Sequence, residues 1–262
     1  MNEYLEFAKE IAYYAGDMMK TYFYKPDKGI IFKKDRTPVT EADQKINNYL
    51  IKKVKEKYPN HGIDGEEEKQ SNNNQYIWVC DPIDGTSMFT NHIPVAVFSL
   101  ALVKDGKPII GVVYDPFLDE IYTAIKGKGA FCNDKQIHVN TLEYGKLGSS
   151  IDYDFWNNAK YDVLKLIKEL SKDFRTSSIG SVAHASMLVA SGKISASIFP
   201  GTDHGHCDIA ASKLIVEEAG GKVTDFYGND QRYDQNIHGA ILTNRVIHDK
   251  LIDIINKTFK ED

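Results

Sequence analysis

After Pro59 the spacing of apolar residues changes from a helical to a strand-like period, and this change constrains the fold most. Over residues 5–22 and 46–54, apolar side chains recur every three or four positions, which predicts two amphipathic helices. The pattern then becomes strand-like, with runs rich in Val, Ile, Phe and Tyr at residues 76–80, 95–103, 109–114 and 121–125. Asp105-Gly106 lies between two of these runs and predicts a hairpin. The chain should therefore combine helices with a sheet that contains this hairpin.

Local signals mark where the helices begin and end. Thr40-Glu41-Ala42-Asp43 resembles a capping box and begins the second helix, and Pro59 ends it. Further helices are predicted over residues 161–170, 184–190, 208–219 and 246–259. The 262 residues contain no repeats or long linkers, and 42% are apolar. We expect one compact unit with an N-terminal half, 1–144, and a C-terminal half, 145–262.

Charge and composition exclude several classes of protein. The net charge is -5 and basic residues are scattered, which argues against binding nucleic acid. The N-terminal residues lack the basic and apolar regions of a secretory signal, and the longest near-apolar run, 93–103, is too short to cross a bilayer. We therefore expect a cytoplasmic protein that does not bind membranes. Three cysteines at irregular spacing predict reduced thiols: Cys80, Cys132 and Cys207.

A short acidic turn follows the first strand-like run. Asp81 and Asp84 lie three residues apart in a segment that Pro82 stiffens and Gly85 opens, and the Thr86 hydroxyl follows. Two carboxylates this close would repel each other, and a bound Mg²⁺ or Mn²⁺ would keep both ionised. The alternative is an ordinary solvated turn, in which Asp, Pro and Gly are common.

Taken together, several segments resemble the inositol monophosphatase family, the Mg²⁺-dependent, lithium-sensitive sugar phosphatases. In family order, the signatures are Gly65-Glu66-Glu67, the Asp81 to Thr86 turn, and Asp208-Ile209-Ala210-Ala211 leading into Glu218-Ala219-Gly220-Gly221. Residues 37–43, 111–114 and 126–131 also match, so the resemblance covers nearly the whole chain. It implies a mixed α/β (α+β) fold, a layered αβαβα sandwich, and a phosphoric monoester hydrolase that uses metal-activated water.

The resemblance also implies a metal site and a catalytic pair. Two or three Mg²⁺ ions are expected per site, with Mn²⁺ able to substitute, and paired metals would activate water and stabilise the leaving oxygen. Their implied ligands are Glu66, Asp81, the Ile83 carbonyl, Asp84 and Asp208. The implied catalytic residues are Glu66, Thr86 and Asp43, the last two orienting the water. Asp43 also lies where a carboxylate caps a helix, so both roles stay open.

Substrate contacts are expected around this turn and in two later segments. Gly85, Thr86 and Ser87 should begin a helix whose N–H groups face the phosphate, and a large Cβ at residue 85 would block that approach. Val182 departs from the family's Ala after Gly180-Ser181. The full expected set is Asp84, Gly85, Thr86, Ser87, Gly180, Ser181 and His206.

The segment before Asp208 departs further from the family. Relatives carry tryptophan directly before this aspartate and often glutamate some seven residues earlier, where this chain has Cys207 and Gly201. His204 and His206 could contact a phosphate or sugar oxygen. Histidines in a glycine-rich loop are more often solvent-exposed polar residues, and we favour this second interpretation for both. Strand alternation should point Cys80 and Cys207 away from the site. Glu67 and Glu68 should be solvated.

Two other interpretations fit less well. Haloacid-dehalogenase phosphatases place their two carboxylates two residues apart, whereas Asp81 and Asp84 are three apart. A non-catalytic metal-binding regulatory module should have lost at least one of the five key residues, and all are present: Glu66, Asp81, Asp84, Thr86 and Asp208. The expected substrate is a small phosphorylated metabolite. Relatives act on inositol phosphate, fructose 1,6-bisphosphate, adenosine bisphosphate, NADP or histidinol phosphate, and the resemblance favours a homodimer.

Overall fold

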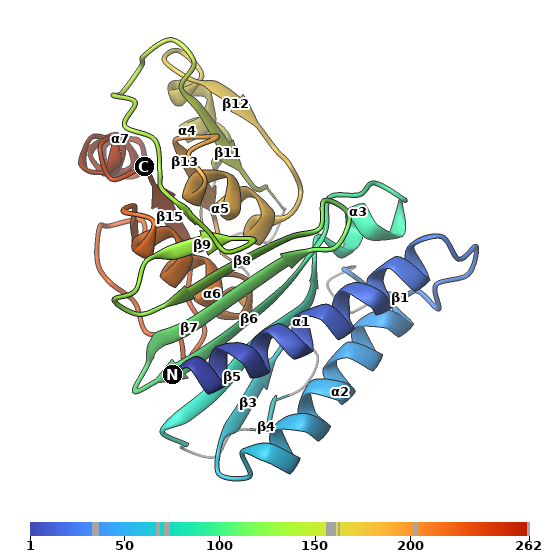
Figure 1. Ribbon diagram of the computed structural model, residues 1–262. Helices are drawn as coiled ribbons and strands as arrows, with labels where there is room; N and C mark the ends of the chain where they lie inside the picture. Colours follow the sequence, from blue (N-terminus) through green and yellow to red (C-terminus); the bar gives the residue numbers. More distant parts are fainter. Residues whose placement is uncertain are drawn as a thin grey trace.

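The computed structural model describes residues 1–32, 37–66, 69–70, 74–155, 161, 163–201 and 204–260. The helices of these residues are α1 (Asn2–Phe23), α2 (Glu41–Lys57), α3 (Thr86–Thr90), α4 (Val163–Leu170), α5 (Val182–Ala190), α6 (Gly205–Glu218) and α7 (His248–Lys260) (Figure 1). The strands are β1 (Ile31–Phe32), β2 (Pro38–Val39), β3 (Gly62–Gly65), β4 (Lys69–Gln70), β5 (Tyr76–Asp84), β6 (Val97–Lys104), β7 (Lys107–Asp115), β8 (Glu120–Ile125), β9 (Ala130–Cys132), β10 (Lys135–Ile137), β11 (Ser150–Tyr153), β12 (Arg175–Ser177), β13 (Ala196–Phe199), β14 (Lys222–Thr224) and β15 (Ala240–Thr243).

Most of the described strands in the first half form one eight-stranded sheet with the order β10-β9-β8-β7-β6-β5-β3-β4. The four predicted strand runs correspond to β5, β6, β7 and β8, and the predicted hairpin joins β6 to β7. Asp105 and Gly106 both have positive φ, 52° and 82°, as the tight hairpin turn requires. These local predictions are confirmed.

Five layers make up the molecule. Helices α1 and α2 run side by side over one face of the eight-stranded sheet (Figure 1). Helices α5 and α6 cover its other face and separate it from a five-stranded sheet with the order β12-β11-β13-β15-β14. Helices α4 and α7 pack on the far side of this second sheet. The layered αβαβα sandwich is therefore confirmed.

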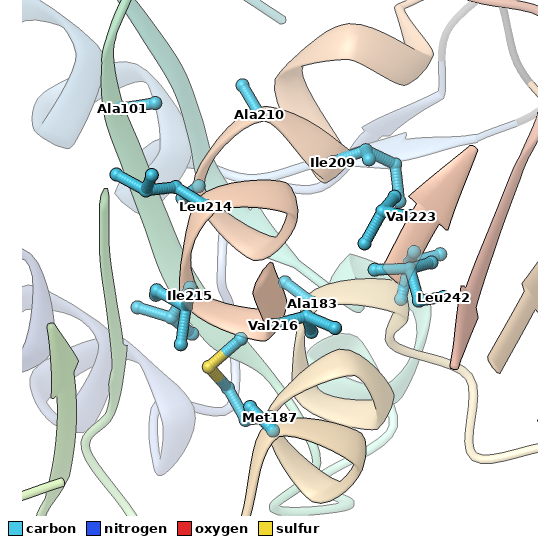
Figure 2. Close-up of a cluster of buried hydrophobic side chains, with 14 of the residues drawn as sticks. Ala101, Ala183, Met187, Ile209, Ala210, Leu214, Ile215, Val216, Val223 and Leu242 are labelled. Atoms are coloured by element: carbon cyan, nitrogen blue, oxygen red, sulfur yellow. The ribbon is translucent and has the colours of Figure 1, made fainter. Parts of the chain in front are cut away.

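Helix α6 is the centre of this arrangement. Every residue from Gly205 to Val216 is buried, because the helix packs against both sheets and α5 rather than against one surface. Figure 2 shows it between Ala101 of β6 on one side and Val223 and Leu242 of the second sheet on the other. Gly111 of β7 permits the close approach, since a Cβ there would lie 2.9 Å from the Ala211 carbonyl oxygen.

Several helices begin at residues other than the predicted ones. Helix α5 begins at Val182, before the predicted residue 184, because the Ser181 hydroxyl accepts from the His184 N–H and caps it. Helix α6 begins at Gly205 rather than 208, and α7 at His248 rather than 246. Helix α4 begins at Val163 rather than 161, and residue 162 lies outside the described part of the chain.

The two halves share one hydrophobic cluster. Ile77 of β5 and Leu242 of β15 both belong to the cluster around α6, which therefore extends across the predicted boundary at 144/145. The division into 1–144 and 145–262 stays a prediction. Among the described helices, none combines the length and the apolar character needed to cross a membrane.

Candidate active site

A bulge at the end of β5 brings two acidic side chains to the same place. Asp81 pairs with Ser99 of β6 and Asp84 with Val97, so three steps along β5 correspond to two along β6. In a regular strand, residues three apart point to opposite faces, and the extra residue removes this difference. The Ile83 N–H donates to Asp81 Oδ1 at 3.0 Å and fixes the bulge.

Asp208 completes an acidic cluster from the opposite side. It lies in the first turn of α6, where a carboxylate also suits the helix dipole. Asp81, Asp84 and Asp208 each offer one carboxylate oxygen, and these oxygens lie within 4.8 Å of one another. The structure thus brings together three of the predicted metal ligands from two distant segments.

Electrostatics in this cluster fit a bound cation. Burial raises the pKa of Asp81 and of Asp208 well above the usual range, and the neighbouring carboxylates raise both further. In the described residues, neither carboxylate forms an ion pair with a lysine or arginine. Buried carboxylates without a basic partner stay ionised together only if a cation compensates them, and oxygen ligands are those that Mg²⁺ prefers. The donor set therefore fits Mg²⁺.

The N-terminus of α5 holds Asp84. Its Oδ2 accepts from the Ser181 hydroxyl at 2.5 Å and from the Ala183 N–H at 2.7 Å, and its Oδ1 lies 3.3 Å from the Val182 nitrogen. Burial raises the pKa of Asp84, whereas these hydrogen bonds oppose the rise. The contact joins β5 of the first half to α5 of the second, which the sequence analysis did not foresee. Ser181 positions Asp84, and the expected substrate contacts of Gly180 and Ser181 stay predictions.

The predicted catalytic residues have clear local partners. The Thr86 hydroxyl donates to the Ile83 carbonyl oxygen at 2.7 Å, so it touches one predicted metal ligand. Asp43 Oδ2 accepts from the Thr40 N–H and hydroxyl at 2.8 and 2.5 Å, and the capping box of α2 is present. The capping role of Asp43 is confirmed. Its pairing with Thr86 around a water stays a prediction.

The backbone and the surroundings of residue 85 both require glycine. It begins the short helix α3 with φ 87°, a conformation that favours glycine. A Cβ there would lie 2.8 Å from the Val95 carbonyl oxygen and 2.9 Å from Ser181 Cβ. The protein's own atoms therefore already exclude a side chain at residue 85, and the approach of a phosphate to this residue stays a prediction. Ser87 follows in the first turn of α3, as predicted.

Glu66 continues the sheet beside Asp81. Its N–H donates to the Cys80 carbonyl oxygen at 3.1 Å, which extends the parallel pairing of β3 with β5. The Glu66 carboxylate is among the groups that raise the pKa of Asp81, so the two lie within electrostatic range. Glu67 and Glu68 lie outside the described residues, as do Thr202 and Asp203.

The segment before Asp208 corrects two interpretations. His206 is not polar surface in a loop: it is only 3% exposed, within α6, and its Nε2 lies 3.3 Å from Asp64 Oδ2. Cys207 lies in the same helix rather than in a strand, so strand alternation does not apply to it. Both errors arise because α6 begins earlier than its apolar pattern indicates. His204 is exposed at the N-cap of α6, and substrate contact by His206 stays a prediction.

Comparisons with known proteins agree with this geometry. Residues 1–259 match the inositol monophosphatase family. The chain belongs to this family. Inositol monophosphatase 2 of Solanum lycopersicum is 32% identical over 98% of this chain and 100% of its own length. The solved Thermotoga maritima IMPase has 28% identity and a TM-score of 0.88, covering 100% of this chain and 99% of that one.

A further solved structure bears on the acidic cluster. It is described as an IMPase/NADP phosphatase complexed with Mg²⁺ and phosphate, and it is 25% identical with a TM-score of 0.81 over 96% of this chain and 92% of its own. Members of the inositol monophosphatase family are phosphoric monoester hydrolases that generally depend on Mg²⁺. This chain is therefore a phosphatase of that family, and its fold is that of the family.

Proposed function

We propose that the protein is a Mg²⁺-dependent phosphomonoesterase that hydrolyses a small sugar, polyol or nucleotide phosphate. The observation that carries the proposal is the cluster of Asp81, Asp84 and Asp208, three buried carboxylates within 4.8 Å of one another. A similar protein with Mg²⁺ and phosphate in its structure supports it. Substrates of relatives, among them NADP and inositol monophosphate, are candidates for this chain.

Different residues of the chain would bind the metal ions, orient the water and contact the phosphate. Asp81, Asp84 and Asp208, with Glu66 and the Ile83 carbonyl oxygen, would hold the metal ions. When bound, Mg²⁺ supplies the positive charge and Lewis acidity that phosphoryl transfer to water requires. Thr86 and Asp43 orient the attacking water, and the hydrogen bond from Thr86 to the Ile83 oxygen fixes the hydroxyl near that ligand. The first N–H groups of α3, at Thr86 and Ser87, face the phosphate.

Location and assembly belong to the same proposal. We infer a cytoplasmic homodimer that binds a small phosphorylated metabolite and neither nucleic acid nor membrane. The net charge of -5 supports the exclusion of nucleic acid, because a protein with net negative charge repels a polyanion.

The decisive experiment is turnover of a phosphate ester by the native protein and by Asp81→Asn, with and without Mg²⁺. An amide cannot supply the charge that Asp81 contributes, so we expect a loss of about 10²-fold or more, the scale of a positioned catalytic group. Asp253→Asn removes an exposed carboxylate on α7 and should leave turnover unchanged. Full activity of the native protein in excess chelator would refute the proposal.

A further inference from the structure

Asp154 is a buried carboxylate whose side chain has no hydrogen-bond or ion-pair partner among the described residues. It directly follows β11 and is 5% exposed, and its backbone N–H donates to the Ile198 carbonyl oxygen of β13 at 3.1 Å. Among the described residues, its side chain forms no hydrogen bond and no ion pair. Leaving an ionisable group buried and unpaired costs free energy, so its presence calls for a ligand or a functional reason.

The sheet topology places Asp154 on the side of the second sheet where the connections to the candidate active site begin. Strand β11 is central to three parallel strands, with β12 on one side and β13 on the other. Parallel strands have their carboxyl ends at one edge, where ligands of α/β sheets bind. From that edge, β12 leads through Gly180-Ser181 into α5, which holds Asp84, and β13 leads into α6, which carries Asp208. Asp154 lies at the end of the middle strand, between these two connections.

Electrostatics agree with this placement. Burial raises the pKa of Asp154 well above its usual range, and Asp152 and Asp84 raise it further. Asp154 in turn contributes to the raised pKa of Asp208. Asp154 therefore lies within electrostatic range of two predicted metal ligands, and it approaches them from the second half of the molecule.

We propose that Asp154 accepts hydrogen bonds from hydroxyl groups on the leaving-group part of the substrate, and thereby selects hydroxyl-rich monophosphates. The inference rests on the proposed function, because it places the substrate at the acidic cluster. A carboxylate accepts hydrogen bonds from hydroxyls and repels a second phosphate at the same position. Asp152, two residues earlier, is partly satisfied: its Oδ1 accepts from the Ile179 N–H at 2.9 Å, and only its Oδ2 is buried without a partner among the described residues.

The test compares esters that do and do not carry hydroxyls on the leaving group. Inositol 1-phosphate and glycerol 2-phosphate have them, and p-nitrophenyl phosphate has none. With Mg²⁺ present, Asp154→Ala should lower kcat/KM for the two polyol esters by about 10- to 100-fold, the scale of a hydrogen bond to a charged group, mainly through KM. The value for p-nitrophenyl phosphate should change little. Asp152→Asn is the matched control and should preserve the ratio between esters.

Stability provides a second measurement. Asp154→Asn replaces an ionisable group that burial destabilises with a neutral one, so the Tm of the metal-free protein should rise while selectivity for polyol esters falls. A carboxylate with a merely structural role would give a lower Tm instead, and that result would overturn the assignment.

The outcomes separate the two proposals. Asp154 does not recognise the leaving group if Asp154→Ala lowers kcat/KM for all three esters in the same proportion. The same conclusion follows if Asp152→Asn changes the ratio of kcat/KM between the polyol esters and p-nitrophenyl phosphate as much as Asp154→Ala does. In both cases the phosphatase proposal stands. If the native protein with Mg²⁺ hydrolyses none of the three, both proposals fail.

Discussion

His248 is a fully buried histidine whose ring lies between two threonine hydroxyls. Its Nδ1 is 2.9 Å from Thr243 Oγ1 and its Nε2 is 3.1 Å from Thr224 Oγ1. Thr224 donates its own proton to the Asp225 carbonyl oxygen, so it accepts from the histidine. Burial lowers the pKa of His248 to about 4, and the ring is therefore neutral at physiological pH. The neutral ring holds the start of α7 against the second sheet.

This histidine makes stability depend on pH. Between pH 6.5 and about 4, the unfolded chain binds a proton that folded His248 does not, so the free energy of unfolding falls as pH falls. From pH 7 to pH 5 we expect a contribution of about 2 kcal/mol. Urea unfolding of the native protein and of His248→Gln at both pH values measures it. Equal losses in the two proteins would contradict the assignment.

Glu218 shows why some of the site's surroundings could not be predicted. Its carboxylate accepts from the Gly127 and Gly129 N–H groups at 2.6 and 2.8 Å and closes the turn between β8 and β9. Both segments resemble family signatures, but no local sequence pattern connects residues so far apart. The same limit hid the contacts of Asp84 with α5 and of His206 with Asp64.

At the scale of elements, predictions succeeded where neighbours in the sequence decide the structure. The hairpin at Asp105-Gly106 and the capping box of α2 depend on a few adjacent residues, and both are present. The starts of α5 and α6 were misplaced because they depend on β5 and β3. Apolar periodicity marks only the regular interior of a helix, whereas Ser181 and His206 lie where α5 and α6 meet these strands.

The N-terminus of α2 offers a test of the two roles of Asp43. Asp43→Asn should lower stability by about 1 kcal/mol through the weakened cap, and should also lower kcat if Asp43 orients the water. Thr40→Val is the matched control, because it removes the other half of the capping box. We expect both variants to lower the Tm and only Asp43→Asn to reduce kcat strongly. If Asp43→Asn and Thr40→Val have equal Tm and equal kcat values, Asp43 caps the helix and does not orient the water.

At the scale of the whole molecule, α6 makes the two halves depend on each other. Its buried side chains fill the space between the sheets, and Asp208 on the same helix meets Asp81 and Asp84 of β5. Removing either sheet would expose one side of α6. Folding of the halves and assembly of the acidic cluster should therefore be coupled.

This coupling predicts a single unfolding transition. Trp78 is fully buried in β5, and the chain's other tryptophan, Trp156, lies outside the described residues. In a Trp156→Phe variant, fluorescence therefore reports only on the first half, whereas far-UV circular dichroism reports on all helices. The two thermal curves should coincide, as for a cooperative two-state unit. Separate midpoints would show that 1–144 and 145–262 unfold as independent domains.

The late position of α6 in the sequence affects how the protein is made. Strands β5 to β9 are synthesised well before Gly205, the first residue of α6. At a synthesis rate of about 5–20 residues per second, the apolar face of these strands that α6 covers is therefore exposed for several seconds. A nascent chain in this condition is a natural client for chaperones that shield apolar surface. Because Asp208 lies on the same helix, the acidic cluster with Asp81 and Asp84 can be complete only after α6 has been synthesised.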